Sequence, residues 1–236
     1  MFDAKKLLGQ FLGSQIPGLG GTLGGKTRDA TELAKANPWK TGALATVLLG
    51  TKTGRSLAGG ALKVGGLALI AGLGYQAYRA YKNGNAPENI RSLPELPAPP
   101  KDSAFNVETG MSNDFALTLI KAMIAAAKAD GHIDADERAS IMQKLHVEDL
   151  GAEAEAFIDA ELANPTDLDA LVAAARTEEQ KVELYTASRL TIEPDTRAER
   201  GYLDLLAGRL GLADGLIDHI EATVAAAKAD QPVGQV

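Results

Sequence analysis

The chain has 236 residues, no cysteine, and 24 Lys and Arg against 31 Asp and Glu, which gives a formal net charge of −7. Without cysteine it has no disulfide, no thiolate nucleophile and no cysteine-based zinc site. Residues 1–63 carry nine basic and three acidic side chains and residues 110–236 carry eleven and twenty-four, so the acidic back half argues against nucleic-acid binding, which needs a positive surface.

Residues 1–40 form a basic, glycine-rich N-terminal segment. Its first dozen residues place apolar side chains at helical spacing beside two lysines: Phe2, Leu7, Leu8, Phe11 and Leu12, with Lys5 and Lys6. This pattern fits an amphipathic helix lying at a membrane surface, and it equally fits a helix packed against the rest of the protein.

Residues 41–82 predict a membrane-associated helical segment. Within it, residues 57–78 include a single charged side chain, Lys63. At about 1.5 Å per residue, such a helix spans a hydrocarbon core of about 30 Å. It can cross as a single span or return as a short hairpin with residues 41–51. The alternative is a helical hairpin buried in a soluble core. The flanking basic residues are slightly more numerous on the N-terminal side, which favours a periplasmic position for the acidic half.

Small residues in this segment recur at alternating steps of four and three: Gly54, Ala58, Ala61, Gly65, Ala68 and Gly72. In lipid, such a seam lets two helices approach closely. We therefore expect it to pair the arms of a hairpin or two copies of the chain. At the far end, Tyr75, Tyr78 and Tyr81 predict an interfacial anchor, because tyrosine rings favour the headgroup region.

Residues 83–110 predict a proline-rich linker. Its prolines are Pro87, Pro94, Pro97, Pro99 and Pro100. They prevent a regular helix and favour extended conformers, so this stretch is the expected boundary between the anchor and the acidic half.

Residues 111–230 predict a compact all-α domain of about seven short helices. Helix starts are indicated by Ser112, Asp134, Thr166, Thr177, Pro194 and Asp214, and one helix end by Gly211. Each signal is followed or preceded by apolar residues at spacings of three and four, and no segment alternates as a strand does.

The stretch ADGHIDADERASIM at residues 129–142 resembles half of a calcium-binding loop. With Gly131 at the sixth position, Asp130, Asp134 and Glu137 fall at suitable positions, whereas Ala126 and Lys128 occupy two positions where oxygen ligands are required. The stretch is also explained by a helix that ends at Gly131 and a capping box that begins the next one. A weak cation site shared with a similar turn is the third alternative; that turn carries Glu193, Asp195 and Glu199.

The longer stretch AAAKADGHIDADERASI, residues 125–141, resembles the hallmark of TerB-like domains, which are named after a tellurite-resistance protein. Together with the glycine-rich front and the linker, the chain looks like the YebE-type inner-membrane proteins of bacteria. The resemblance implies an all-helical fold, a location at the bacterial inner membrane and an acidic surface that binds metal or partners. It assigns Asp130, Asp134, Asp136 and Glu137 to the acidic turn, with Glu193, Asp195 and Glu199 opposite.

No pairing of a nucleophile with a base is evident, and His132, His146 and His219 are expected in solvent. We therefore expect a membrane-anchored interaction or sensor module without catalysis, acting in envelope stress or metal tolerance. Its acidic surface would bind a protein partner or a divalent cation, and no other cofactor is expected. The alternative is a divalent-metal-dependent enzyme that uses the acidic turn at residues 130–137.

Overall fold

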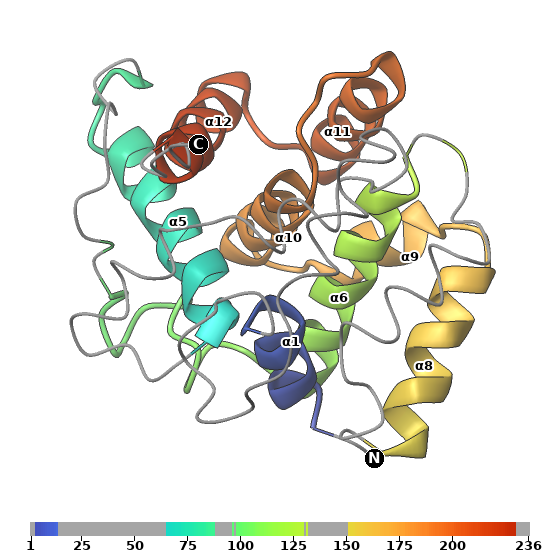
Figure 1. The fold of residues 1–236 in the computed structure, drawn as a ribbon. Helices are drawn as coiled ribbons and strands as arrows, with labels where there is room; N and C mark the ends of the chain where they lie inside the picture. The colour runs from blue at the N-terminus through green and yellow to red at the C-terminus, as the bar shows by residue number, and fades with distance from the viewer. Residues whose placement is uncertain are drawn as a thin grey trace, which may run out of the picture.

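The computed structural model describes residues 3–13, 65–87, 96, 98–129, 131 and 151–229. Helix is the only regular secondary structure in these ranges, which confirms the predicted all-α class (Figure 1). The helices are α1 (Ala4–Gly13), α5 (Gly65–Lys82), α6 (Asn113–Ala127), α8 (Ala152–Ala163), α9 (Leu168–Ala174), α10 (Glu178–Thr191), α11 (Arg197–Leu210) and α12 (Asp214–Ala229).

Four helices from distant parts of the chain form a ring. Helix α1 packs on α5 and α6, and α10 packs on the same two helices. Figure 1 shows α1 between the lower parts of α5 and α6, with α10 above it. Helix α12 lies against α5 and α10, and α11 contacts α10, α9 and α6. The front and the back of the sequence therefore contribute to one core.

Helix α10 is the central element of this core. Every side chain from residue 182 to residue 191 is buried, because α5, α6, α11 and α12 all pack around it. Its start is fixed locally by a capping box, in which the Thr177 hydroxyl accepts from the Gln180 N–H and the Gln180 side chain accepts from the Thr177 N–H.

The contact between α5 and α10 is made close by a glycine. A Cβ placed on Gly74 would lie 3.3 Å from the Phe105 ring and 3.3 Å from Cγ1 of Val182. Leu67, Ile70 and Leu73 of α5 are buried in the same core. Glycine at this position lets the two backbones approach while the aromatic ring of Phe105 fills the space beside them.

This packing corrects the expected separation of a membrane segment from the tail. The described part of that segment, residues 65–82, shares its core with α10 and α12. None of the helices in the described ranges is long and apolar enough to cross a membrane. The earlier part, residues 41–64, lies outside the described residues. A helix with few charges and many small side chains is suited to burial among other helices as well as to lipid, and residues 65–82 are packed among helices.

The expected linker also contributes to the core. Phe105, within the predicted span 83–110, is only 2% exposed and contacts α5. Residues 98–112 therefore run back onto the helices in place of a spacer between two separate units.

The small-residue seam and the tyrosines have protein neighbours where they are described. Gly54, Ala58 and Ala61 lie outside the described residues, whereas Gly65, Ala68 and Gly72 belong to α5. The rings of Tyr75 and Tyr78 pack on Phe105 at centroid distances of 5.9 and 5.5 Å, and the Tyr81 ring lies 5.8 Å from that of His219. These rings thus contact the core where lipid headgroups were expected.

The local helix signals of the back half are largely confirmed. Ser112 caps α6, accepting from the Phe115 N–H at 3.1 Å, and Gly211 ends α11 with φ +66°. Three boundaries differ. Helix α6 ends at Ala127, before the predicted end at Gly131. The N-cap of α9 is Asp167 and not Thr166. Helix α11 begins at Arg197, after the turn that contains Pro194, because Thr196 and Glu199 form a capping box there.

Substitution of Gly74 tests whether α5 belongs to this core. In Gly74→Leu the new side chain meets Phe105 and Val182, so we expect the free energy of unfolding of the full chain to fall by about 1–3 kcal/mol. The matched control is Gly208→Ala, at an exposed helical position where a Cβ has no neighbour within 4 Å; it should raise stability by about 0.5–1 kcal/mol. Urea denaturation followed by circular dichroism measures both. An unchanged midpoint for Gly74→Leu would show that α5 does not pack on α10.

Candidate functional site

The predicted acidic turn lies almost wholly outside the described residues. Asp130, Asp134, Asp136 and Glu137 are not described, so their geometry stays a prediction. Across the described ranges, no three His, Asp or Glu side chains are grouped so that they could hold a metal ion. What the structure describes is the approach to the turn, at the end of α6.

This approach is organised by Lys128. Its ammonium group donates to the carbonyl oxygen of Glu161 at 3.2 Å and to that of Asn164, at the C-terminal end of α8. A cation there complements the partial negative charge of the helix end. Burial lowers the pKa of Lys128, and the Glu161 carboxylate partly opposes this shift. Lys128, which occupied a ligand position of the calcium-loop alignment, therefore joins α6 to α8.

Gly131 lies beyond the end of α6, which is at Ala127 and not at the glycine, yet its own backbone conformation accounts for a glycine there. Gly131 has φ +150°, a conformation that residues with a side chain rarely adopt, and its N–H donates to the carbonyl of Lys128 at 3.1 Å. The glycine thus has a conformational reason to be present that does not depend on a cation.

The second acidic turn is held by its own hydrogen bonds. The Glu199 carboxylate accepts from the Thr196 N–H and hydroxyl, both at 2.9 Å, and Glu193 lies 3.6 Å from the Arg189 guanidinium. Asp195 is exposed, and its carbonyl accepts from Arg200 at 2.8 Å. Two of the three predicted ligands are thus already used to shape this turn.

Arg189 connects the turn to the core. Its side chain is 6% exposed; Nε donates to Glu221 of α12 at 2.5 Å and an Nη group donates to the Ile192 carbonyl at 2.9 Å. The Tyr185 hydroxyl donates to the same Glu221 at 2.9 Å. Burial raises the pKa of Tyr185, and the Glu221 carboxylate raises it further. This network is fully paired, so we assign it to structure.

His219, which was expected in solvent, is also buried. Its two ring nitrogens lie 2.6 Å from the Gly215 carbonyl and 2.8 Å from the Asn85 carbonyl. The ring therefore joins α12 to the turn that follows α5.

Glu183 on α10 is the exception among the buried charged groups. It is 2% exposed, and its pKa is raised from 4.5 to about 8, first by burial and then by the nearby Glu179 carboxylate. No hydrogen-bond donor or cation among the described residues opposes this shift. One turn further along the same helix, the buried Thr186 hydroxyl also has no hydrogen-bond partner. Buried polar groups without partners are uncommon and call for an explanation.

Glu183 is not among the predicted site residues, although the sequence carries a signal for it. Ala187 and Leu190 follow it at spacings of four and seven and therefore share its side of the helix. Both are buried. A glutamate within an apolar stripe predicts a buried carboxyl group, which is a stronger functional indication than an acidic residue on a solvated face.

The raised pKa of Glu183 makes stability depend on pH. In the folded chain it keeps its proton up to about pH 8, whereas in the unfolded chain it loses the proton near pH 4.3. Between these values the folded state binds more protons, so the free energy of unfolding falls as pH rises and the loss is complete above about pH 8. We expect Glu183→Gln to remove this fall and to stabilise the chain at pH 8.5 by up to about 5 kcal/mol, with little effect near pH 4.5.

Thermal or urea denaturation between pH 4.5 and 9 measures this effect, with the exposed Glu155→Gln as the control that should follow the parent curve. A parallel pH dependence in Glu183→Gln and the parent chain would contradict a buried, protonated Glu183.

Comparison with known proteins places these features in a family. A family model described as "Protein of unknown function (DUF533)" matches residues 34–230, which include α5, the proline-rich stretch and the helices of the back half. The chain is similar to the "Uncharacterized protein in ampR 5'region" of Yersinia enterocolitica, with 31% identity over 106 residues, 45% of this chain and 76% of that protein. No solved structure matches. The chain therefore belongs to the DUF533 family, which is a TerB-like family.

Proposed function

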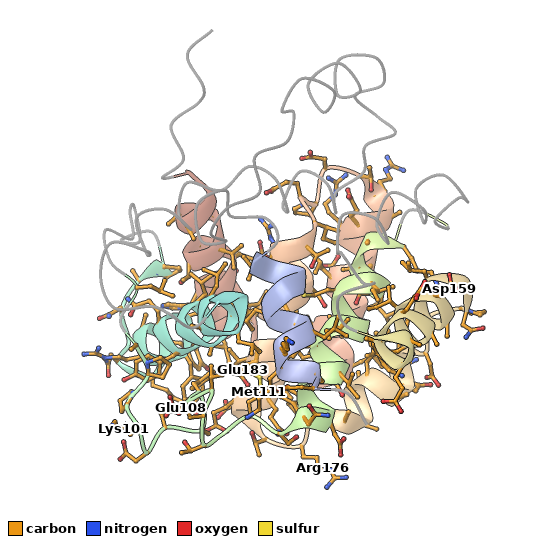
Figure 2. The ribbon with its side chains drawn as sticks, turned by 60° about the horizontal axis from the view of Figure 1, so that its bottom comes forward. Lys101, Glu108, Met111, Asp159, Arg176 and Glu183 are labelled. Atoms are coloured by element: carbon orange, nitrogen blue, oxygen red, sulfur yellow. The ribbon has the colours of Figure 1, made fainter. Side chains whose placement is uncertain are left out.

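We propose that this chain is a non-catalytic interaction module that presents an acidic helical surface to a basic protein partner. The observation that carries the proposal is the charge of residues 151–229, which include sixteen acidic and seven basic side chains. The exposed acids extend over several helices and turns: Glu153, Glu155, Asp159, Asp167, Asp169, Glu193, Asp195, Asp204, Asp214 and Asp218. Figure 2 shows Asp159 at the outer edge of the molecule, on α8.

The spread of these carboxylates supports a protein partner in preference to a single cation. A hard cation needs six to eight oxygen ligands gathered around one point, whereas an extended field of one sign steers an oppositely charged surface and aligns it. The acidic turn at residues 130–137 keeps the cation alternative open, because its carboxylates lie close together in the sequence. An enzyme that uses a metal at this turn is the remaining alternative.

Neutralising the exposed acids tests the proposal. The variant Glu155→Gln, Asp204→Asn, Asp218→Asn removes three exposed carboxylates, and the control Lys101→Gln, Arg176→Gln, Arg197→Gln removes three exposed cations. From a bacterial membrane extract at low salt, we expect the immobilised parent chain and the control to retain the same basic proteins, and the acid-neutralised variant to retain them at least about threefold less. Quantitative mass spectrometry reads the result. Equal retention by all three proteins would contradict an acidic docking surface.

Titration of the purified full chain with metal ions distinguishes a cation site from a protein-binding surface. Calorimetric titration of the full chain with calcium, magnesium, manganese or zinc should give no saturable heat at micromolar concentrations. The full chain is required because α5 and α1 complete the core of the back half. Micromolar binding that disappears in Asp134→Asn, Glu137→Gln would replace the protein partner with a metal site at the acidic turn.

Attachment to the bacterial inner membrane, with the acidic half in the periplasm, is part of the same proposal. Since the apolar side chains of α5 and the described ones of α1 are covered by other helices, we assign the attachment to the glycine-rich residues 41–64. We expect the full chain to remain with bacterial membranes after a carbonate wash, and Leu48→Glu, Leu49→Glu to release it. Recovery of the parent chain in the wash would contradict membrane attachment.

A further inference from the structure

Helix α1 closes the ring of four helices as a separate, short element. Ala4, Leu7 and Leu8 are fully buried, whereas Lys6 is exposed. Figure 2 shows α1 lying in front, across the space between α5 and α6. Beyond its apolar face, the described bonds of α1 to the rest of the chain are few: the Ala4 N–H donates to Asn113 Oδ1 at 2.7 Å, and Lys5 Nζ donates to the Val107 carbonyl at 3.2 Å.

The orientation of α10 follows from its contacts with other helices. Val182 faces α5, because its Cγ1 lies beside Gly74. Ser188 faces α6 and α11, since its hydroxyl lies 3.5 Å from the Ala122 carbonyl and 3.4 Å from the Tyr202 hydroxyl. Tyr185 and Arg189 face Glu221 of α12. Three sides of the helix are thereby assigned.

The fourth side of α10 faces the centre of the ring, opposite α1. With about 100° between successive residues of a helix, the side chains left on this fourth side are Glu183, Thr186, Ala187 and Leu190. In the view of Figure 2, the Glu183 label lies below α5 and beside α1. Glu183, whose raised pKa no described donor or cation opposes, and the Thr186 hydroxyl, which has no hydrogen-bond partner, are thus together on the side of α10 that faces the ring.

The described side chains of α1, those of residues 4–8, supply these groups with no partner. Its described buried side chains are those of Ala4, Leu7 and Leu8, which have no polar atom. A buried carboxyl and a buried hydroxyl without partners destabilise the packed state, because each has lost its hydrogen bonds to water. The surface of α5, α10 and α6 on which α1 packs therefore contains polar groups that the described side chains of α1 do not satisfy.

A lysine or arginine at this position would satisfy both groups. An ammonium carries three donors and can bond the Glu183 carboxylate and the Thr186 hydroxyl at the same time, and a charge-assisted bond in a dry site is among the stronger ones. The walls of the seat are apolar, with Ile70 and Leu73 from α5 and Leu119 from α6 fully buried. An occupant must therefore be an amphipathic helix whose apolar face carries one cation.

We propose that the cradle formed by α5, α10 and α6 is a docking site for a basic amphipathic helix of a partner protein, which displaces α1 and pairs a lysine or arginine with Glu183 and Thr186. Two further observations favour this occupant. Helix α1 has ten residues, a length at which an isolated helix is marginal. The acidic back half also attracts a basic segment. The cradle is distinct from the exposed acidic surface, since Glu183 and Thr186 are both buried.

Defined peptides test the proposal on the full chain. The probes are a fluorescent peptide of residues 1–13 and the same peptide with Leu7→Lys or with Leu8→Lys, because either leucine can face α10. We expect one lysine peptide to bind the parent chain about tenfold more tightly than the unmodified peptide, a difference of about 1.4 kcal/mol. Hydrogen exchange at the α1 amides should rise in the same samples as α1 leaves its seat.

Two variants identify the pairing. Glu183→Gln, which keeps the size of the side chain, should abolish the preference for the lysine peptide, and Thr186→Val should reduce it. The acid-neutralised variant Glu155→Gln, Asp204→Asn, Asp218→Asn should keep the preference, which separates this site from the exposed surface. Equal binding of all three peptides, binding of none, a preference that survives Glu183→Gln, or no change in exchange at α1 would each overturn the proposal.

Discussion

The close packing of α5 on α10 is the contact on which the rest of the structure depends. It joins segments about a hundred residues apart, as the bond from the Tyr78 hydroxyl to Glu178 illustrates, with a sequence separation of 100. The absence of a side chain at Gly74 allows this approach, and Phe105 fills the space beside it. Helices α12 and α1 both pack on α5, so neither would have its present position if α5 were elsewhere. The tail helices are therefore not a separate folding unit.

Complete burial of α10 means that its polar side chains need partners inside the protein. On the sides that face α11 and α12 the partners exist: Ser188 meets Tyr202, and Arg189 meets Glu221. On the side that faces the ring, the Thr186 hydroxyl has no hydrogen-bond partner and no described donor or cation opposes the raised pKa of Glu183. Unsatisfied groups on one side of a helix whose other sides are paired indicate a specific requirement at that side. A functional site is therefore better sought at Glu183 and Thr186, where hydrogen bonding is incomplete, than in the network of Arg189 and Glu221, where it is complete.

The sequence predicted the local features of the fold and missed the long-range ones. The caps at Ser112 and Thr177 and the end at Gly211 depend on a few neighbouring residues, so their signals are readable without knowing what surrounds them. Whether α5 packs against lipid or against protein depends on helices far along the chain. Its small apolar side chains are compatible with both environments. The stripe of Ala187 and Leu190 indicates that Glu183 is buried, but the absence of a partner for its carboxyl group depends on the other helices and cannot be predicted from α10 alone.

The second acidic turn bears on how the first one should be understood. In the second, Thr196 and Glu199 stand three residues apart and form a capping box, so the carboxylate that resembled a metal ligand accepts bonds from Thr196. Asp134 and Glu137 have the same spacing, and each pair precedes an apolar helical pattern. If Glu137 is used in the same way, a cation at the first turn retains too few oxygen ligands to be held tightly. The acidic residues of the two turns are then explained first by helix initiation. Their negative charge adds to that of the whole acidic surface, which can attract a basic partner.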